Sequence, residues 1–309
     1  PRVKSTGRLG YEYYNKLGYV PYNVKINESA ARTLEYAYDD WTIYHTALLA
    51  GNRSVADTYK KRAANYTNVF DTNMGYARPR YADGRWKENF NLLNTHGEGF
   101  IEGNALNYSF YVPQDVDNMI RLMGGDKSFV SKLDSLFTMH LPAEFFAQTE
   151  DVTEEGLLGG YVHGNEPSHH VIYLYNKVGQ PWKTQKYVAE VLHNLYQNAP
   201  DGICGNEDCG QMSAWFVFSS MGFYPVDPIS GKYEIGTPIF PEVKMHLANG
   251  KTFAVLAPAV SRENIYVQSV KLNGRPYDKS YITHEQIMNG DTLEFEMGNR
   301  PGPVWYNNM

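Results

Sequence analysis

The sequence predicts a protein that is mostly α plus β, with helical hairpins first and a small antiparallel β-domain after them. Through much of residues 1–226, apolar residues recur at intervals of three and four, as on one face of a helix. After residue 227, short segments alternate apolar and polar residues or are β-branched, and Asn-Gly turns separate them, as in antiparallel strands. We therefore expect two domains, 1–226 and 227–309, and a chain of 309 residues is long enough to give each its own core.

The helical pattern predicts about seven helices, arranged as three hairpins plus one. The first begins after Ser29 and ends at Gly51-Asn52, and the second begins at Ser54, so a short turn joins them as an αα-hairpin. Further helices are expected at 116–123, 126–138, from 171, at 182–198 and at 211–222. Strands are expected at 244–247, 252–256, 265–272 and 292–297, with turns at Asn249-Gly, Asn273-Gly and Asn289-Gly.

Three loops rich in glycine and carboxylates precede helices, at 96–104, 159–170 and 201–210. Glycine lets the backbone turn tightly and brings carboxylates close to a ligand. If consecutive hairpins pack side by side around an axis, the three loops lie at one end and form one candidate site. The alternative for the loop at 201–210 is a solvated acidic turn that caps the next helix.

Composition excludes some classes of function. The formal net charge of -6 is mild, and no basic stripe indicates nucleic acid. No run of 18 or more apolar residues indicates a membrane span. The cysteines, Cys204 and Cys209, are too few for a zinc signature, and we interpret them as packing thiols or a local staple. The start at Pro1 resembles a cut inside a longer protein, so the compartment stays open.

Glu102 and Asp208 are the two carboxylates that suit cleavage of a glycosidic bond. Such cleavage needs one carboxylic acid to protonate the leaving oxygen and a second carboxylate that activates water or attacks the sugar. Spacing along the chain does not give their separation, so it does not choose between these two mechanisms. Any acidic enzyme or sugar-binding loop has similar residues, so the pair alone does not identify the function.

A further polar cluster combines Asn165-Glu166 with His169-His170. Adjacent residues on a helix point about 100° apart, so the two histidines are not expected to share one metal. A hard cation such as calcium, held by carboxylate, amide and backbone oxygens, suits Asn165 and Glu166 better. The alternative is a helix N-terminus, with Glu166 facing the positive end of the dipole. Glu35, Asp39 and Asp40, on the first helix, are interpreted as a solvated acidic face.

Five motifs then stand in one order along the chain: Thr33-Leu-Glu-Tyr-Ala-Tyr-Asp-Asp-Trp41, Glu102-Gly-Asn-Ala105, His163-Gly-Asn-Glu-Pro-Ser-His-His170, Asn206-Glu-Asp-Cys-Gly-Gln-Met-Ser-Ala-Trp215 and Gly222-Phe-Tyr-Pro225. Together they closely resemble glycoside hydrolase family 92, the calcium-dependent exo-acting α-mannosidases. The likeness covers nearly the whole chain. It implies that residues 1–226 are the C-terminal part of an (α/α)6 toroid, with a calcium ion in the active site and hydrolysis that inverts configuration.

The resemblance also implies roles for residues. Glu102 matches the general acid of the family, and Asp208 matches its general base. Many members have an acidic residue where this chain has Asn206, so the division of roles among Asn206, Glu207 and Asp208 stays open. Asn165 and Glu166 are expected near the calcium ion and the sugar. The other expected substrate-binding residues are Glu98, Asn104, His163, His169 and His170.

Family members are longer than this chain, and they carry an N-terminal β-sandwich that helps to wall the pocket. The chain therefore resembles the C-terminal part of such an enzyme, and by itself we expect it to be inactive or weakly active. The expected partner is an α-mannoside oligosaccharide or glycan. A periplasmic or extracellular location is expected from the resemblance alone.

Two other functions remain as alternatives. A phosphorylase of the (α/α)6 type would need phosphate donors in place of a base, and the carboxylate of Asp208 argues against it. A non-catalytic carbohydrate-binding module, with the C-terminal β-domain as its binding part, would bind mannose with calcium and without turnover.

Overall fold

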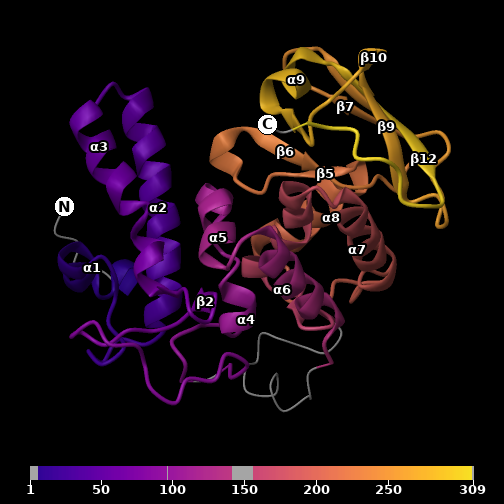
Figure 1. The fold of residues 1–309 in the computed structure, drawn as a ribbon. Coiled ribbons are helices and arrows are strands. Elements are labelled where there is room, and N and C mark those ends of the chain that lie inside the picture. The colour runs from indigo at the N-terminus through magenta and orange to yellow at the C-terminus, as the bar shows by residue number, and fades with distance from the viewer. Residues whose placement is uncertain (1–5, 96, 141–155, 308–309) are drawn as a thin grey trace. The chain divides into compact units, whose positions relative to one another are not determined.

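The computed structural model describes residues 6–95, 97–140 and 156–307 (Figure 1). The chain divides into two compact units, the first ending at Ser168 and the second beginning at His169. Both combine helices with small sheets, so the prediction of a mostly α protein with added β-structure is confirmed at that level. The chain changes from mainly helices to mainly strands at Phe223–Tyr224, whereas the compact units divide earlier in the chain.

The first unit is mainly helical. Its α-helices are α1 (Tyr11–Leu17), α2 (Ser29–Leu49), α3 (Arg53–Arg62), α4 (Ala105–Tyr108), α5 (Val116–Leu122) and α6 (Asp126–Thr138). Its short 3-10 helices are η1 (Thr6–Arg8), η2 (Asn65–Val69), η3 (Pro113–Asp115) and η6 (Glu166–Ser168). Two antiparallel ribbons complete it: β1 (Phe70–Asp71) with β2 (Tyr76–Ala77), and β3 (Leu157–Leu158) with β4 (Tyr161–Val162).

The predicted first hairpin is confirmed, because α2 and α3 lie side by side (Figure 1). Gly51 takes a left-handed conformation (φ +71°) between the two helices. Asn52 then caps α3, since its side chain accepts a hydrogen bond from the Val55 amide at 3.2 Å.

Helix α1 lies where the sequence predicted only turns. A helix of seven residues is not stable by its own hydrogen bonds, so its stability comes from packing. Tyr14 is fully buried, and its ring meets Tyr36 of α2 edge-to-face at 5.5 Å between ring centroids. Because this contact joins residues far apart in sequence, the local pattern did not indicate the helix.

The second unit combines helices with two sheets in its described residues. Its elements are η7 (Val171–Val178), α7 (Pro181–Asn194), η8 (Asp208–Gly210), α8 (Gln211–Met221), β5 (Phe223–Tyr224), η9 (Pro228–Ser230), β6 (Lys232–Ile235), β7 (Glu242–His246), β8 (Thr252–Leu256), β9 (Tyr266–Leu272), β10 (Arg275–Pro276), β11 (Tyr281–Thr283), α9 (His284–Asn289) and β12 (Thr292–Gly298). The helices predicted at 182–198 and 211–222 are confirmed as α7 and α8, while the segment from Val171 is a 3-10 helix.

The larger sheet has the strand order β10-β9-β12-β8-β7. Strand β12 is antiparallel to β9 but parallel to β8, so the prediction of a purely antiparallel β-domain is wrong. The turns at Asn249-Gly and Asn273-Gly do join antiparallel neighbours. Asn289-Gly instead ends α9, with Gly290 left-handed at φ +76°. Both a tight hairpin and a helix C-terminus need positive φ, so the dipeptide alone does not separate them.

One hydrophobic core joins the sheets of the second unit to its last long helix. It includes Met221 of α8, Phe223, Phe253, Val255 and Phe295. Helix α7 contacts β9, and Gln185 of α7 accepts a hydrogen bond from the Val267 amide at 3.2 Å. Helices and strands of this unit therefore share their packing, which explains why its boundary precedes α7.

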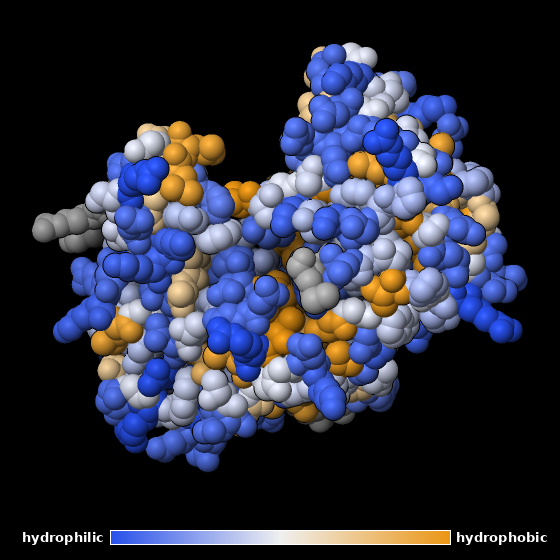
Figure 2. Space-filling view, turned by 45° about the horizontal axis from the view of Figure 1, so that its top comes forward, coloured by the Kyte–Doolittle hydropathy of each residue, from blue (hydrophilic) through white to orange (hydrophobic). Residues whose placement is uncertain are grey.

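The surface is mostly hydrophilic on the face shown in Figure 2, with hydrophobic patches among the polar side chains. Large hydrophobic side chains exposed in the described residues include Leu49, Val217 and Phe240. Among the helices of these residues, none is both long and apolar enough to cross a membrane.

Candidate active site

Two of the three predicted loops meet in the first unit. The Asn165 side chain donates a hydrogen bond from Nδ2 to the backbone oxygen of Glu102 at 2.7 Å. Asn107 donates from Nδ2 to the backbone oxygen of Gly160 at 2.6 Å. Asn104 caps α4 by accepting from the Asn107 amide at 3.1 Å. The loops at 96–104 and 159–168 are therefore joined by side-chain bonds, as expected for parts of one site.

Glu102 has an unusual backbone. Its φ of +49° lies in the left-handed region, which non-glycine residues seldom adopt. Such conformations cost about 1–3 kcal/mol and persist where surrounding contacts impose them. The bond from Asn165 to the Glu102 carbonyl is one such contact. The side chain of Glu102 is partly exposed, so it can reach a ligand.

Glu35 is a carboxyl group that the sequence assigned to a solvated face, and the structure corrects this. It accepts a hydrogen bond from the Tyr108 hydroxyl at 3.2 Å. Burial raises the pKa of Glu35 to about 7, and the negative charges of Asp39 and Glu102 add to the rise. The charge of Glu102 also contributes to a raised pKa of Tyr108. Glu35, Tyr108 and Glu102 are therefore electrostatically coupled.

The sequence contained one signal for Glu35, its i,i+4 pairing with Asp39, which is unfavourable in water. The decisive information was absent from the local pattern, because Tyr108 lies 73 residues further along the chain.

Three of the expected substrate-binding residues are engaged inside the first unit. Glu98 forms a buried ion pair with Lys87, with 2.7 Å between Nζ and Oε2. Asn104 donates from Nδ2 to the backbone oxygen of Leu93 at 3.1 Å, in addition to capping α4. His163 is fully buried, with Nδ1 at 3.1 Å from the Tyr161 hydroxyl. These contacts hold the two loops in place.

The third loop belongs to the second unit and turns sharply before α8. Asp208, Cys209 and Gly210 all have positive φ, at +47°, +58° and +100°. Asp208 is exposed, and Asn206 is exposed too. Glu207 differs, because Oε1 accepts a hydrogen bond from the Ser213 amide at 3.1 Å. Its carboxylate thus satisfies a donor in the first turn of α8, whereas the Asp208 carboxylate faces solvent.

Buried contacts surround His169 below this loop. Its Nδ1 lies 3.2 Å from Nε2 of Gln211, and its backbone oxygen accepts from the Trp215 indole at 3.0 Å. His170 is also buried. Cys204 and Cys209 are free thiols, and burial raises the pKa of Cys204 to about 11, so it stays a thiol at neutral pH.

The donors at Asn165 and Glu166 are of the type that calcium prefers. Asn165 uses Nδ2 to bind Glu102, and its Oδ1 is the atom suited to a cation. Glu166 adds a carboxylate from the neighbouring position. No group of three or more His, Cys, Asp or Glu residues able to hold a metal occurs in the described residues. The oxygen atoms of these two residues are of the chemical type that suits calcium, and an ion held there would take its remaining oxygens from backbone, water or ligand.

The comparisons with known proteins cover nearly the whole chain. The glycosyl hydrolase family 92 catalytic domain matches residues 1–299. A family GH92 α-mannosidase from Bacteroides thetaiotaomicron is 40% identical, with a TM-score of 0.88, over 94% of this chain and 38% of that one. Its complex with mannoimidazole matches at 39% identity and a TM-score of 0.88, over 94% of this chain and 39% of that one.

A family GH92 inverting mannosidase from Bacteroides thetaiotaomicron is 37% identical, with a TM-score of 0.86, over 99% of this chain and 43% of that one. An uncharacterized secreted glycosidase of Arthroderma benhamiae is 29% identical over 94% of this chain and 39% of its own length. The chain thus spans about two fifths of the relatives it matches. Because the family model covers nearly all of it, the chain belongs to glycoside hydrolase family 92.

Proposed function

We propose that this chain supplies the catalytic carboxylates of an exo-α-mannosidase, which removes terminal α-linked mannose from mannosides or N-glycans by a calcium-dependent, inverting reaction. The observation that carries the proposal is the left-handed backbone at Glu102 and at Asp208, each in a loop that leads into a helix. The likeness to mannosidases, one of them solved with mannoimidazole, supports the substrate class.

The same proposal includes the (α/α)6 arrangement of the helices and the cellular location of the protein. The helices of this chain would form part of an (α/α)6 toroid, which sequence outside the chain completes. Full activity would then need the rest of the parent protein, including its N-terminal β-sandwich. A periplasmic or extracellular location is supported by the secreted fungal relative.

Glu102 is the proposed general acid, which gives its proton to the glycosidic oxygen. The Glu35 carboxyl, whose pKa burial raises to about 7 with a smaller contribution from the charge of Glu102, would interact electrostatically with the acid. The phenol of Tyr108 donates to Glu35 and has a raised pKa, so it remains protonated across the working range.

Asp208 is the proposed general base, which takes a proton from the attacking water. Its exposed carboxylate lies directly before α8 and faces solvent, where a water molecule can reach it. In an inverting enzyme the two carboxyls stand roughly 6.5–9.5 Å apart, which leaves room for the water. Glu207 would position this loop through its bond to Ser213, and Asn206 would contact the sugar or water without accepting a proton.

Asn165 and Glu166 would hold the calcium ion, through an amide oxygen and a carboxylate. When bound, calcium would orient and polarise hydroxyl groups of the terminal mannose. The bond from Asn165 to the Glu102 backbone connects this ligand to the acid loop, so occupancy of the metal and placement of the acid depend on the same side chain. His163, His169 and His170 would support the loops around the sugar.

The test uses the full-length parent protein with a panel of α-linked mannobioses, with and without EDTA. We expect EDTA to abolish mannose release and calcium to restore it. Glu102→Gln and Asp208→Asn are each expected to lower kcat by 10²–10⁴, the usual contribution of a general acid or base. Glu88→Gln and Asp201→Asn, both exposed carboxylates outside these roles, are the matched controls.

Undiminished activity in EDTA would remove the metal from the proposal, and an active Glu102→Gln or Asp208→Asn would overturn that residue's role. Calcium-dependent mannose binding without any release would instead identify a carbohydrate-binding module.

A further inference from the structure

Gln211 is the first residue of α8, and it directly follows a segment with a strained backbone. Asp208 and Cys209 have φ of +47° and +58°, which non-glycine residues seldom adopt. Each such residue costs about 1–3 kcal/mol, so contacts from outside the segment must hold it in this conformation. The backbone amide of Gln211 donates to the backbone oxygen of Asp208. The position of Gln211 is therefore coupled to that of the proposed base.

The side chain of Gln211 makes two hydrogen bonds to buried rings. Its Nε2 lies 3.2 Å from Nδ1 of His169, and it donates to the Tyr224 hydroxyl at 3.3 Å. An amide NH2 group can only donate, so Nδ1 of His169 is the acceptor and the neutral ring carries its proton on Nε2. Both hydrogens of the amide nitrogen are thus engaged, by two acceptors from different segments of the chain.

The two acceptors are themselves fixed in place. The backbone oxygen of His169 accepts from the indole of Trp215, which is fully buried. The Tyr224 ring stacks on Tyr173, with 5.4 Å between ring centroids, and Tyr173 donates to the Ser219 hydroxyl at 2.8 Å. His169 and Tyr224 are both buried, so Gln211 anchors the start of α8 to the close-packed interior of the second unit.

Glu207 provides a different kind of contact. Its Oε1 accepts from the Ser213 amide, which belongs to the first turn of α8 itself. This bond ties the loop to the helix, whereas the bonds of Gln211 reach residues 42 and 13 positions away. Gln211 thus orients the loop and the helix together against the interior of the unit.

We propose that Gln211 is a positioning residue for Asp208, and that it acts through the segment 208–210. The inference rests on the proposed function, in which Asp208 is the general base. The carboxylate takes a proton from water while the water oxygen forms a bond to the sugar carbon and the bond to the leaving group breaks. This transfer needs the carboxylate within about 2.6–3.2 Å of the water, so a small displacement of the loop slows it. Gln211 acts without touching the sugar, so its removal changes kcat rather than KM.

The test measures kcat and KM of the full-length protein on α-mannobiose and on α-mannosyl fluoride. Fluoride leaves as an anion without a proton from Glu102, whereas attack by water still needs Asp208. Gln211→Met keeps the length of the side chain and removes both donors. We expect it to lower kcat about 10²-fold on both substrates, the effect of a misplacement of about 1 Å, and to leave KM unchanged. Gln197→Met, the same change at an exposed glutamine, is the matched control.

A loss confined to mannobiose, as expected of Glu102→Gln, would connect Gln211 to the acid and overturn the assignment. A raised KM with unchanged kcat would assign Gln211 to substrate binding instead. Kinetics equal to those of Gln197→Met would reject any role in the reaction.

If the wild-type protein hydrolyses neither substrate, the proposed function fails, and hydrogen–deuterium exchange then tests the anchoring by Gln211 alone. Faster exchange of the backbone amides at 208–213 in Gln211→Met than in Gln197→Met would still support it, because lost anchoring lets the segment open more often. Equal exchange in the two variants would reject it.

Discussion

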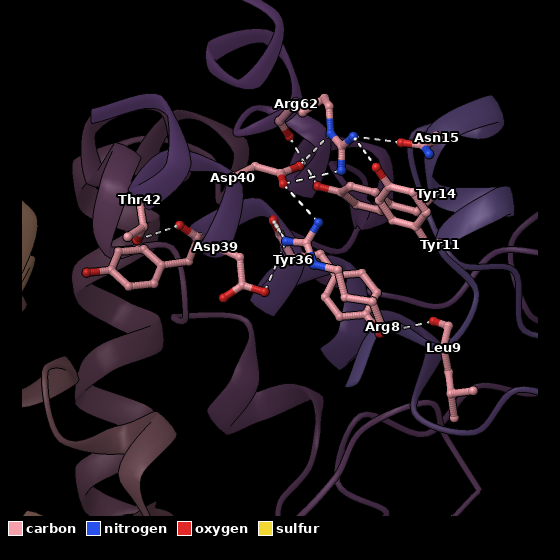
Figure 3. Close-up of polar contacts among 11 residues, drawn as sticks. Arg8, Leu9, Tyr11, Tyr14, Asn15, Tyr36, Asp39, Asp40, Thr42 and Arg62 are labelled. Carbon is pink, nitrogen blue, oxygen red and sulfur yellow. Dashed lines mark hydrogen bonds and ion pairs between the residues drawn. The ribbon is translucent and has the colours of Figure 1, made fainter. Parts of the chain in front are cut away.

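Two carboxyl groups on α2, five residues apart, have opposite surroundings. Asp40 is fully buried between two guanidinium groups, with Arg8 at 3.1 Å and Arg62 at 2.7 Å (Figure 3). Glu35 is partly buried, and its neighbours are the hydroxyls of Tyr108 and Tyr111. The first group is neutralised by cations, whereas the second is surrounded by neutral donors.

The difference separates a structural carboxylate from one suited to chemistry. Asp40 joins η1, α2 and α3, and Arg62 extends the network to Asn15 of α1 at 2.7 Å (Figure 3). Both oxygens of the Asp40 carboxylate are engaged by arginine side chains, so this group has a structural role. Burial without a cation raises the pKa of Glu35 to about 7, where a proton can be exchanged. Burial alone does not indicate function, because the partner decides it.

The largest loss of stability is expected from Asp40→Ala. Removing the anion leaves two arginine side chains without their shared partner, which typically costs about 3–5 kcal/mol. Urea unfolding of the full-length protein at neutral pH measures this loss. Asp39→Ala is the matched control, because Asp39 also binds Arg8 but is exposed, and we expect it to cost less than about 1 kcal/mol. Equal losses in the two variants would contradict the structural role of Asp40.

A smaller effect, dependent on pH, is expected from Glu35→Gln. The folded state holds the Glu35 proton up to a pKa of about 7, whereas the unfolded chain releases it near 4.5. The contribution of Glu35 to the free energy of unfolding is therefore fully present below pH 4.5. It is lost as pH rises through 7, and the total loss is about 3 kcal/mol. Glutamine does not titrate, so the variant should lack this fall in stability. Unfolding curves between pH 4 and 8 measure it, and parallel curves for the two proteins would contradict it.

Glu35→Gln also tests the electrostatic interaction between Glu35 and Glu102. Without the neighbouring carboxyl, the alkaline limb of the kcat/KM profile is expected to move to lower pH, because a charge that favours protonated Glu102 is lost. If kcat/KM instead falls by the same factor at every pH, and the alkaline limb does not move, Glu35 has a structural role.

The smallest effect is expected at Glu207, whose partner is a backbone amide. Glu207→Ala removes the acceptor for Ser213 and should cost about 1 kcal/mol, as for other helix caps. Glu207→Gln keeps an oxygen at that position, so it should restore stability and retain activity. Loss of activity in Glu207→Gln, measured on mannobiose, would instead assign the base to Glu207 rather than to Asp208.

Local patterns account for much of the fold and for the identity of the site residues. The limits of α2, the hairpin with α3 and the Asn249-Gly turn depend on residues close together in sequence, so periodicity and turn chemistry predict them. The parallel pairing of β12 with β8 was not predictable in this way, because β9, β10, β11 and α9 intervene between the two strands.

The sequence by itself determined the helical and β-rich parts, the family and the order of the acidic motifs. Only the tertiary structure decided the surroundings of each charge. Asp39 is exposed and pairs with Arg8, Asp40 meets arginines 32 and 22 residues away, and Glu35 meets a tyrosine 73 residues away. Helical spacing gives the face of α2 on which a carboxylate lies, but its partners come from segments that only folding brings close. The protonation state of a buried group depends on those partners, and with it the chemistry that the group can perform.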